Sequence, residues 1–321
     1  MMIISMHEAE KLKNEAVAVA IGMFDGVHLG HRKLMDVLKQ SAQKSGCKTL
    51  VYTFINHPEE ILFNQPPKYI DTLEEKAAKL ETLGIEYLAA VVFTREMAAM
   101  PPREFILSLL RAFRVKHIVA GYDFRFGDGG RGHAGDLEIF GSEMGFDSHI
   151  VPAVVSDGKI ISSSRIRELI AGGHMEEAND ILGWKYAITG SISQGKRIGS
   201  EMGFPTANLE FEASKILPAS GVYFSAAELD EKIFPAITNI GVNPTVSADG
   251  KVGIESHIIG YSGDIYGKRI KLYFLKKHRN ERKFDNRDEL ARQIARDVKK
   301  AMDYFMKADA SGIKQAGVYK V

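Results

Sequence analysis

The hydrophobic pattern of this chain changes near Gly183, and this change restricts the possible folds more than any other feature. Before it, apolar runs alternate with helical patterns, as in a parallel sheet covered by helices on both faces. After it, only short alternating runs occur, which is typical of a small antiparallel barrel. One helical pattern, 287–306, comes at the end. The sequence therefore predicts a Rossmann-like α/β domain over 1–183 and an antiparallel β-barrel with a terminal helix over 184–321.

The predicted elements follow one another at short intervals. The strands expected in the first domain are 16–22, 49–54, 87–93, 117–121 and 148–154. Its helices are expected after residue 22 as far as Gly46, then at 72–83, 103–112 and 135–144. The strands expected in the barrel are 186–192, 221–229, 236–242, 253–261 and 269–275. The sequence leaves the pairing of these strands open.

Composition excludes several classes of protein. Lys plus Arg (42) nearly equals Asp plus Glu (41), so no bulk positive charge attracts nucleic acid or a membrane surface. The single Cys47 excludes a disulfide framework. No run approaches the roughly 18 apolar residues of a membrane span. We therefore expect a cytoplasmic protein whose partners are small molecules, and its oligomeric state remains open.

The segment Gly22–Met35 is the most informative motif. It leaves a predicted buried strand, turns through glycines and enters a helix that carries His28 and His31 on one face. Free backbone N–H groups and the helix dipole favour an anion at such an N-terminus. Gly30 leaves room for a ligand to approach the backbone. The pattern predicts a phosphate site, and the plainer alternative is that the histidines only cap or pack.

A second motif, 161–170, carries three serines followed by a short helix with two arginines. Ser163, Ser164, Arg165 and Arg167 could together bind a pyrophosphate or triphosphate. The plainer alternative is a serine-capped helix with solvated arginines.

Two glycine patterns imitate nucleotide-binding fingerprints. Gly127, Gly129 and Gly132 spell GxGxxG, but the first glycine does not directly follow its strand, so we interpret the segment as a mobile loop. The run 190–196 nearly completes a P-loop, but Arg197 stands where Ser or Thr would bind magnesium.

The segment 203–211 (GFPTANLEF) predicts a metal site. Gly203 and Pro205 shape a tight turn into a strand on which Thr206 and Asn208 alternate. Both side chains offer oxygen ligands to a hard cation such as Mg²⁺.

These motifs resemble those of the bacterial bifunctional riboflavin kinase/FMN adenylyltransferase (FAD synthetase) family. Residues 28–31 and 162–167 resemble the HxGH and SSTxxR signatures of nucleotidyltransferases, with Ser164 where Thr is usual. The runs 22–31, 120–127 and 131–137 look like the FMN adenylyltransferase module, and PTAN is similar to riboflavin kinases.

The resemblance implies that the first domain makes FAD from FMN and ATP and that the barrel makes FMN from riboflavin and ATP, both with Mg²⁺. It implies catalytic roles for His28, His31, Arg167 and, as the kinase base, Glu255. It implies ATP or phosphate contacts at Gly22, Phe24, Asp25, Gly30, Ser163, Ser164, Arg165, Gly195, Gly203 and Pro205. It implies flavin contacts at Asp123, Phe124, Arg125, Arg279, Glu281 and Phe284, and metal ligands at Thr206 and Asn208.

The barrel departs from the family pattern in two places. Ser200 stands where Arg is typical, and 260–261 replace an acid–aromatic pair. These departures favour one alternative, an FAD synthetase whose kinase half is weak or inactive. Two further alternatives stay open: a flavin sensor without catalysis, and an adenylyltransferase for a phosphorylated sugar or pantetheine.

Overall fold

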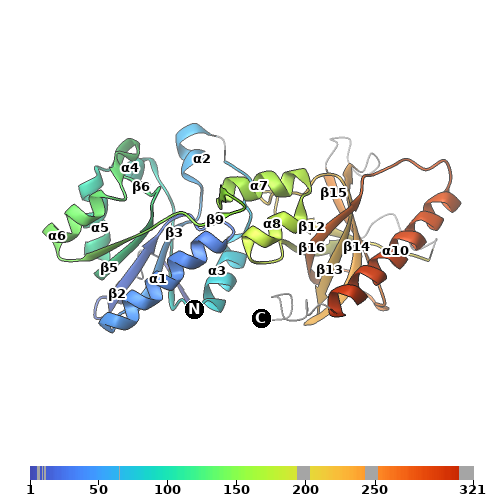
Figure 1. Ribbon diagram of the computed structural model, residues 1–321, viewed down its shortest axis with the longest axis horizontal. Helices are drawn as coiled ribbons and strands as arrows, with labels where there is room; N and C mark the ends of the chain where they lie inside the picture. The colour runs from blue at the N-terminus through green and yellow to red at the C-terminus, as the bar shows by residue number, and fades with distance from the viewer. Residues whose placement is uncertain are drawn as a thin grey trace. The chain divides into compact units, whose positions relative to one another are not determined.

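The structure is a computed structural model (Figure 1). It describes residues 1–5, 8, 10, 12–64, 66–193, 203–242 and 252–310. The chain divides into two compact units, Met1–Ser163 and Ser164–Val321. Within the described ranges, no helix has both the length and the apolar character needed to cross a membrane.

The first unit is built on a six-stranded sheet in the order β1-β4-β3-β2-β5-β8, with every pair parallel. Its strands are β1 (Met2–Ile4), β2 (Ala16–Ile21), β3 (Lys48–Phe54), β4 (Tyr87–Val91), β5 (Arg114–Gly121) and β8 (Asp147–Val151). The strand order reverses beside β2, which has β3 on one side and β5 on the other. In such sheets the crevice at the carboxyl ends of the strands, where the order reverses, is the usual ligand site.

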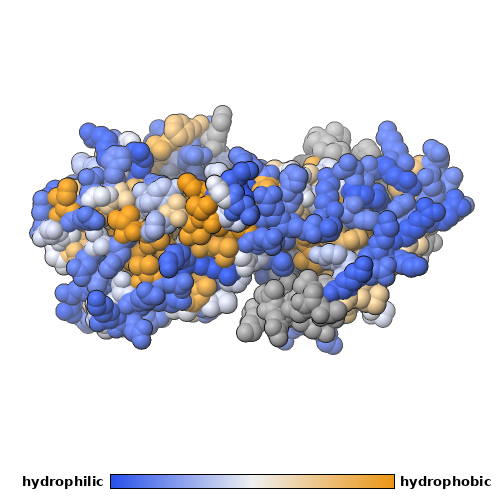
Figure 2. All heavy atoms as spheres, viewed as in Figure 1, coloured by the Kyte–Doolittle hydropathy of each residue, from blue (hydrophilic) through white to orange (hydrophobic). Residues whose placement is uncertain are grey.

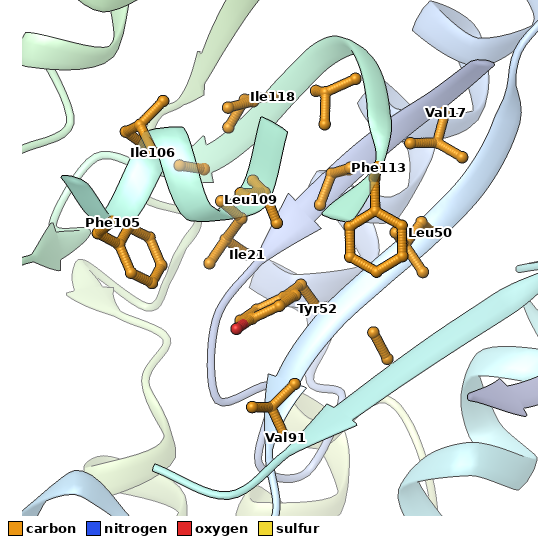
Figure 3. Packing of buried hydrophobic residues seen from close by; sticks show 14 of the residues in the cluster. Val17, Ile21, Leu50, Tyr52, Val91, Phe105, Ile106, Leu109, Phe113 and Ile118 are labelled. Carbon is orange, nitrogen blue, oxygen red and sulfur yellow. The ribbon is translucent and has the colours of Figure 1, made fainter. Parts of the chain in front are cut away.

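Helices cover both faces of this sheet, as expected. They are α1 (Leu29–Ser45), α2 (Pro58–Phe63), α3 (Leu73–Thr82), α4 (Arg95–Ala98), α5 (Pro102–Ala112) and α6 (Asp136–Met144). On one face, Val17 and Ile21 of β2 belong to a cluster with Leu109 of α5 (Figure 3). On the other face, the small side chains of β2, such as Ala18, pack in a cluster with Leu38 of α1. A strand buried on both faces therefore ends directly at the segment that carries the two histidines.

Several short strands of the first unit are absent from the sequence prediction. They are β1 and the hairpins β6 (Arg125–Phe126) with β7 (Gly132–His133) and β9 (Val155–Ser156) with β10 (Lys159–Ile160). Strands of two or three residues are too short to show a hydrophobic period, so only their pairing defines them. The first two glycines of the GxGxxG segment lie between β6 and β7, and Gly132 begins β7; Gly127 has φ +74° and packs against Pro102 too closely for a side chain.

The second unit contains a closed barrel in the order β11-β12-β15-β14-β13-β16, with all pairs antiparallel. Its strands are β11 (Ala187–Ser193), β12 (Ala207–Phe211), β13 (Gly221–Leu229), β14 (Lys232–Val242), β15 (Val252–Ile258) and β16 (Arg269–Arg279). Its helices are α7 (Ser163–Gly172), α8 (Met175–Leu182) and α10 (Arg287–Ala310). The parallel sheet, the barrel and the terminal helix confirm the predicted fold class.

Strand β14 begins four residues earlier than predicted. The two-residue turn before it consists of Asp230 and Glu231, both with positive φ (50° and 61°). This is the geometry of a type I′ hairpin turn, which lets pairing continue up to the turn. The turn was missed because neither residue is the Gly or Asn that usually signals it.

Helix α8 is attached to the barrel of its own unit by a buried amide. Asn179 donates through Nδ2 to the carbonyl of Phe274 (2.9 Å) and accepts from the backbone N–H of Tyr186 (2.7 Å). These contacts explain why residues 164–183 group with the barrel, whereas the change of pattern lies at Gly183, the C-cap of α8.

Candidate functional sites

The two histidines of the HxGH motif lie together at the start of α1. His28 is the N-cap of this helix, and its Nδ1 accepts a hydrogen bond from the backbone N–H of His31 at 3.3 Å. Their rings stack with centroids 3.6 Å apart and an interplanar angle of 18°. Since β2 ends at Ile21, the pair lies at the carboxyl end of the strand beside which the strand order reverses. Both predicted residues are therefore at a position suited to an anion.

The loop between β2 and α1 has an unusual backbone. Phe24 and Val27 have positive φ angles of 48° and 44° without being glycine, which costs about 1–3 kcal/mol each. The ring of Phe24 lies over Gly22, where a Cβ would be 3.0 Å from ring atoms. A Cβ on Gly30 would be 3.1 Å from the ring of His28. A side chain at either position would have to displace one of these rings, and the surrounding fold must hold the strained loop in place.

Asp25, which the family resemblance connects with ATP, has structural partners inside the first unit. Its buried carboxylate accepts hydrogen bonds from the backbone N–H groups of Ile70 (3.0 Å) and Asp71 (3.1 Å). It thereby ties the histidine loop to the segment that precedes α3. A contact of Asp25 with ATP remains a prediction.

Two lysines of α3 also hold this loop, and sequence reasoning missed both. Lys76 is buried, and its Nζ donates to the carbonyl of Met23 (2.6 Å) and to Oγ1 of Thr53 (3.3 Å). Burial lowers its pKa. Lys79 donates to the carbonyl of Gly26 at 3.3 Å. Their spacing of three places them on one helix face, but nothing local shows that this face meets the loop.

The pKa of His31 lies well below the ordinary imidazole value. Burial is the main cause, and the neighbouring His28 and Lys76 add repulsion of the charged form. The ring of His31 also meets Phe24 edge to face, with centroids 5.3 Å apart. A neutral imidazole is therefore expected at this position when no anion is bound.

The serine–arginine motif is divided between the two units. Ser163 donates through Oγ to the carbonyl of Asp25 (2.9 Å), so it joins the histidine loop. Ser164, Arg165 and Arg167 belong to the second unit, on α7, which begins at Ser163 and not after the third serine as expected. Arg165 forms an ion pair with Glu177 at 3.0 Å. That these residues act together with the histidines remains a prediction.

An aromatic cavity of about 170 Å³ lies in the first unit, beside hairpin β6–β7. It is lined by Phe54, Phe93, Phe105, Phe124 and Phe126, together with Pro58, Leu62, Met97, Ala98, Arg125 and three glycines. Phe124 and Phe126 stack at 5.3 Å, while the side chain of Arg125 is exposed. Asp123 lies in the turn between β5 and this hairpin, with Oδ1 close above Gly121. The three phenylalanines outside the 120–127 motif, Phe54, Phe93 and Phe105, were missed because they come from three separate segments.

In the barrel, register brings three polar residues into one row. Asn208 of β12 pairs with Glu255 of β15, which pairs in turn with Asn239 of β14. Burial alternates along β15, so Glu255 lies on the face opposite the buried Ser256. Asn239 donates to Glu281 at 3.0 Å. The structure therefore brings together Asn208, Glu255 and Glu281, which the sequence analysis named separately.

The predicted flavin residues at the end of β16 and directly after it make contacts within the second unit. Arg279 donates through Nε (3.0 Å) and one terminal nitrogen (2.9 Å) to the buried Asp297 of α10. The guanidinium of Arg282 lies 4.6 Å from the ring centroid of Phe284. Asp297 was missed, since a buried acid on an amphipathic helix shows no local signal. Contacts of Arg279, Glu281 and Phe284 with a flavin remain predictions.

The segment 195–206, which the family resemblance connects with ATP, is described only in part. Gly195 and Ser200 lie outside the described residues. Gly203 has φ +81°, as a turn glycine, and leads to Pro205 and Thr206 directly before β12. Gly260 also has a positive φ (79°), so its departure from the family pattern coincides with a left-handed turn after β15.

The donor set beside β12 suits Mg²⁺. The Thr206 hydroxyl and the Asn208 amide oxygen are hard oxygen donors of the kind that Mg²⁺ prefers. In the described part of the chain, no group of three or more His, Cys, Asp or Glu side chains could hold a metal ion.

A parallel sheet with a histidine pair on the helix after its central strand defines the nucleotidyltransferase class, here joined in one chain to a six-stranded barrel. The FAD synthetase family model matches residues 10–165, and the riboflavin kinase family model matches residues 182–305. The chain belongs to the family of bifunctional riboflavin kinase/FMN adenylyltransferases.

Individual relatives match along almost the whole chain. The bifunctional riboflavin kinase/FMN adenylyltransferase of Bacillus subtilis is 36% identical over 304 residues, 93% of this chain and 96% of that protein. The protein of the same name from Escherichia coli K12 is 36% identical over 307 residues, 95% of this chain and 97% of that protein. A crystal structure named as a macrolide-efflux protein from Streptococcus pneumoniae is 31% identical, with a TM-score of 0.86 over 94% of this chain and 99% of that one.

Proposed function

We propose that this chain converts riboflavin into FAD in two steps that each use ATP. The barrel transfers the γ-phosphoryl group of ATP to riboflavin, giving FMN and ADP. The first domain, 1–183, transfers AMP from a second ATP to FMN, giving FAD and pyrophosphate. The observation that carries the proposal is the match of both family models, one to each half of the chain.

In adenylyl transfer, a phosphate oxygen of FMN attacks the α-phosphorus of ATP. A new P–O bond forms, the bond to the β-phosphate oxygen breaks, and pyrophosphate leaves. Because Nδ1 of His28 accepts a hydrogen bond, the proton of its neutral ring is on Nε2, which can donate to a phosphate oxygen. We assign His28 and His31 to the charge that develops on the α-phosphate. We assign Ser163, Ser164 and Arg167 to the departing pyrophosphate.

The remaining nucleotide contacts follow from the same loop. We assign phosphate contacts to the backbone of Gly22 and Gly30 and to the Phe24 segment; the ring of Phe24 packs against Gly22 and the ring of His28 against Gly30. The carboxylate of Asp25 holds this loop through backbone hydrogen bonds. Arg165 of α7 is assigned as a second cation for the phosphates.

The aromatic cavity is suited to the flavin of FMN. A planar isoalloxazine ring can stack on phenylalanine faces, and Phe124 is one of the rings that line this space. The exposed Arg125 is the residue we assign to the FMN phosphate, because guanidinium binds phosphate in a bidentate manner. Asp123 is assigned to the polar edge of the flavin.

In riboflavin phosphorylation, the ribityl 5′-hydroxyl attacks the γ-phosphorus, and ADP leaves. Glu255 takes the hydroxyl proton as general base. Thr206 and Asn208 would hold Mg²⁺, which neutralises charge on the phosphates of ATP when it is bound. Gly203 and Pro205, with Gly195 outside the described residues, are assigned to the loop over ATP. Arg279, Glu281 and Phe284 are assigned to the riboflavin side of this site.

We further propose a cytoplasmic location, small molecules as the partners and a domain boundary at Gly183. The near balance of acidic and basic residues supports the second point, since no polyanion is attracted. The change of sequence pattern supports the third.

Product analysis tests the proposed function. Purified protein is incubated with Mg-ATP and either riboflavin or FMN, with and without EDTA, and the flavins are separated by chromatography. FMN should be converted to FAD and riboflavin to FMN and then FAD, in both cases only with Mg²⁺. If FMN remains unchanged, the first assignment is wrong. If only riboflavin remains unchanged, even after Ser200→Arg restores the usual cation, the chain is an FAD synthetase alone.

A further inference from the structure

The segment that carries Thr206 has little support from the sheet. The ladder between β12 and β15 consists of two pairs, Ala207 with Ser256 and Asn208 with Glu255. Thr206 and Pro205 lie before the first pair. Proline has no backbone N–H, so Pro205 cannot extend the ladder as a donor. Some other contact must hold this segment beside β15.

A histidine of β15 makes that contact. Nδ1 of His257 lies 2.9 Å from the carbonyl oxygen of Pro205. A carbonyl oxygen can only accept, so Nδ1 must carry the proton and donate. The ring of His257 also meets Phe204 edge to face, with centroids 5.5 Å apart at 81°. One side chain therefore contacts two successive residues of the GFPTAN segment.

The same strand carries the proposed base. Glu255 and His257 are two residues apart on β15 and so lie on the same face of the barrel wall. Both lie in the part of β15 that is adjacent to β12 and to the segment that precedes β12. A shift of the Pro205 segment would therefore change the distance between Thr206 and Glu255.

We propose that His257 is a positioning residue for riboflavin phosphorylation: its Nδ1–H holds the Pro205 carbonyl, so that Thr206 is kept beside Asn208 and Glu255. This inference rests on the proposed function of the barrel. His257 acts through the backbone of the metal-ligand segment and is not itself assigned to substrate or metal. Loss of its hydrogen bond should weaken the use of Mg-ATP by about ten-fold, the upper range for one such bond.

Three variants of the full chain separate the hydrogen bond from the ring contact. His257→Asn keeps a nitrogen donor near the position of Nδ1. His257→Leu keeps apolar bulk and removes the donor, and Phe204→Leu removes the aromatic contact but keeps the donor. Should His257→Leu fail to fold, His257→Gln replaces it, because its amide nitrogen lies near the position of Nε2 and not of Nδ1.

Kinetics of riboflavin phosphorylation give the first readout, with FMN adenylylation by the same chain as internal control. His257→Leu should raise the KM for Mg-ATP about ten-fold with a smaller change in kcat. His257→Asn should stay within about three-fold of the parent, and FAD formation from FMN should be unchanged in all variants. An equal loss in His257→Asn and His257→Leu would overturn the proposal, because the donor would then be irrelevant.

Hydrogen exchange gives a readout that needs no kinase activity. Amides in 203–208 should exchange about ten-fold faster in His257→Leu than in the parent, and at the parental rate in His257→Asn. Unchanged exchange in His257→Leu would overturn the positioning role. A parent chain that does not phosphorylate riboflavin would instead overturn the proposed function, whatever the exchange rates.

Discussion

The two candidate sites differ in how the chain assembles them. In the first unit, one continuous segment, 22–31, contains both histidines and the glycines around them, and it ends on a helix N-terminus. In the barrel, the corresponding polar row needs three strands, with Asn208, Glu255 and Asn239 brought together only by register. The surfaces differ as well: on the face in Figure 2, exposed apolar residues gather more over the first unit than over the barrel.

This difference indicates which groups supply the electrostatics in each site. A helix N-terminus offers backbone N–H groups that already favour an anion. A barrel wall has no such dipole, so side-chain oxygens and a bound cation must stabilise the charge of the phosphates there. The supports differ in the same way, since a buried lysine holds the loop of the first site and a histidine holds the segment of the second.

The sharpest test of this contrast is Glu255→Gln. The substitution keeps the shape of the side chain but removes the base, so riboflavin phosphorylation should fall by about two to four powers of ten. FAD formation from FMN should not change. Initial rates of both steps, followed by flavin chromatography, measure the effect. Glu210→Gln, an exposed acid on β12, is the matched control. If the variant phosphorylates riboflavin at a rate within ten-fold of the parent, Glu255 is not the general base.

His28→Ala and His31→Ala test the other side of the comparison. Each should lower FAD formation by about two to three powers of ten, the range for losing one preorganised donor. FMN affinity should change little, and riboflavin phosphorylation should be retained. His149→Asn on β8 controls for loss of an imidazole elsewhere in the same unit. Turnover within a few-fold of the parent would mean that the histidine pair only caps and packs.

Lys76→Met should have a smaller effect. The side chain keeps its length, but the carbonyl of Met23 loses one of its donors beneath the histidine loop. We expect about ten-fold slower FAD formation and a free energy of unfolding lower by about 1–3 kcal/mol. Lys33→Met, at an exposed position of α1, is the control. Denaturant unfolding and FAD assays measure the two effects. Equal stability and equal rates of FAD formation in the two variants would contradict the supporting role of Lys76.

Acidification should produce the smallest effect. The pKa of His31 is lowered in the folded state, so as pH falls below about 6.5 the unfolded chain binds the proton first. Stability is therefore full above that pH and is lost below it, by at most about 1.4 kcal/mol per pH unit. The pKa of His117, in the same unit, is also lowered. Thermal unfolding at about pH 7.5 and 5.5 should show a smaller acid loss in His31→Asn than in the parent, and equal losses would exclude a contribution from His31.

The local sequence was sufficient for features that depend on short-range geometry. The βα alternation, the capping box at Thr72 and the histidine pair of one helix turn follow from periods of 2.0 and 3.6 residues, which backbone sterics impose on any chain. The same reasoning anticipated the full extent of β13. Motif order then indicated the chemistry of each half, and the family comparisons confirmed it.

Tertiary structure decided everything that depends on segments distant in the chain. The burial of Lys76 under the histidine loop, the pairing of Arg279 with Asp297, and the contact of His257 with Pro205 each join separate elements. Charged or polar residues with this spacing are usually solvated, so their local pattern carries no sign of a partner. Strand register has the same property, because many registers satisfy one alternating pattern until closure of the barrel selects one.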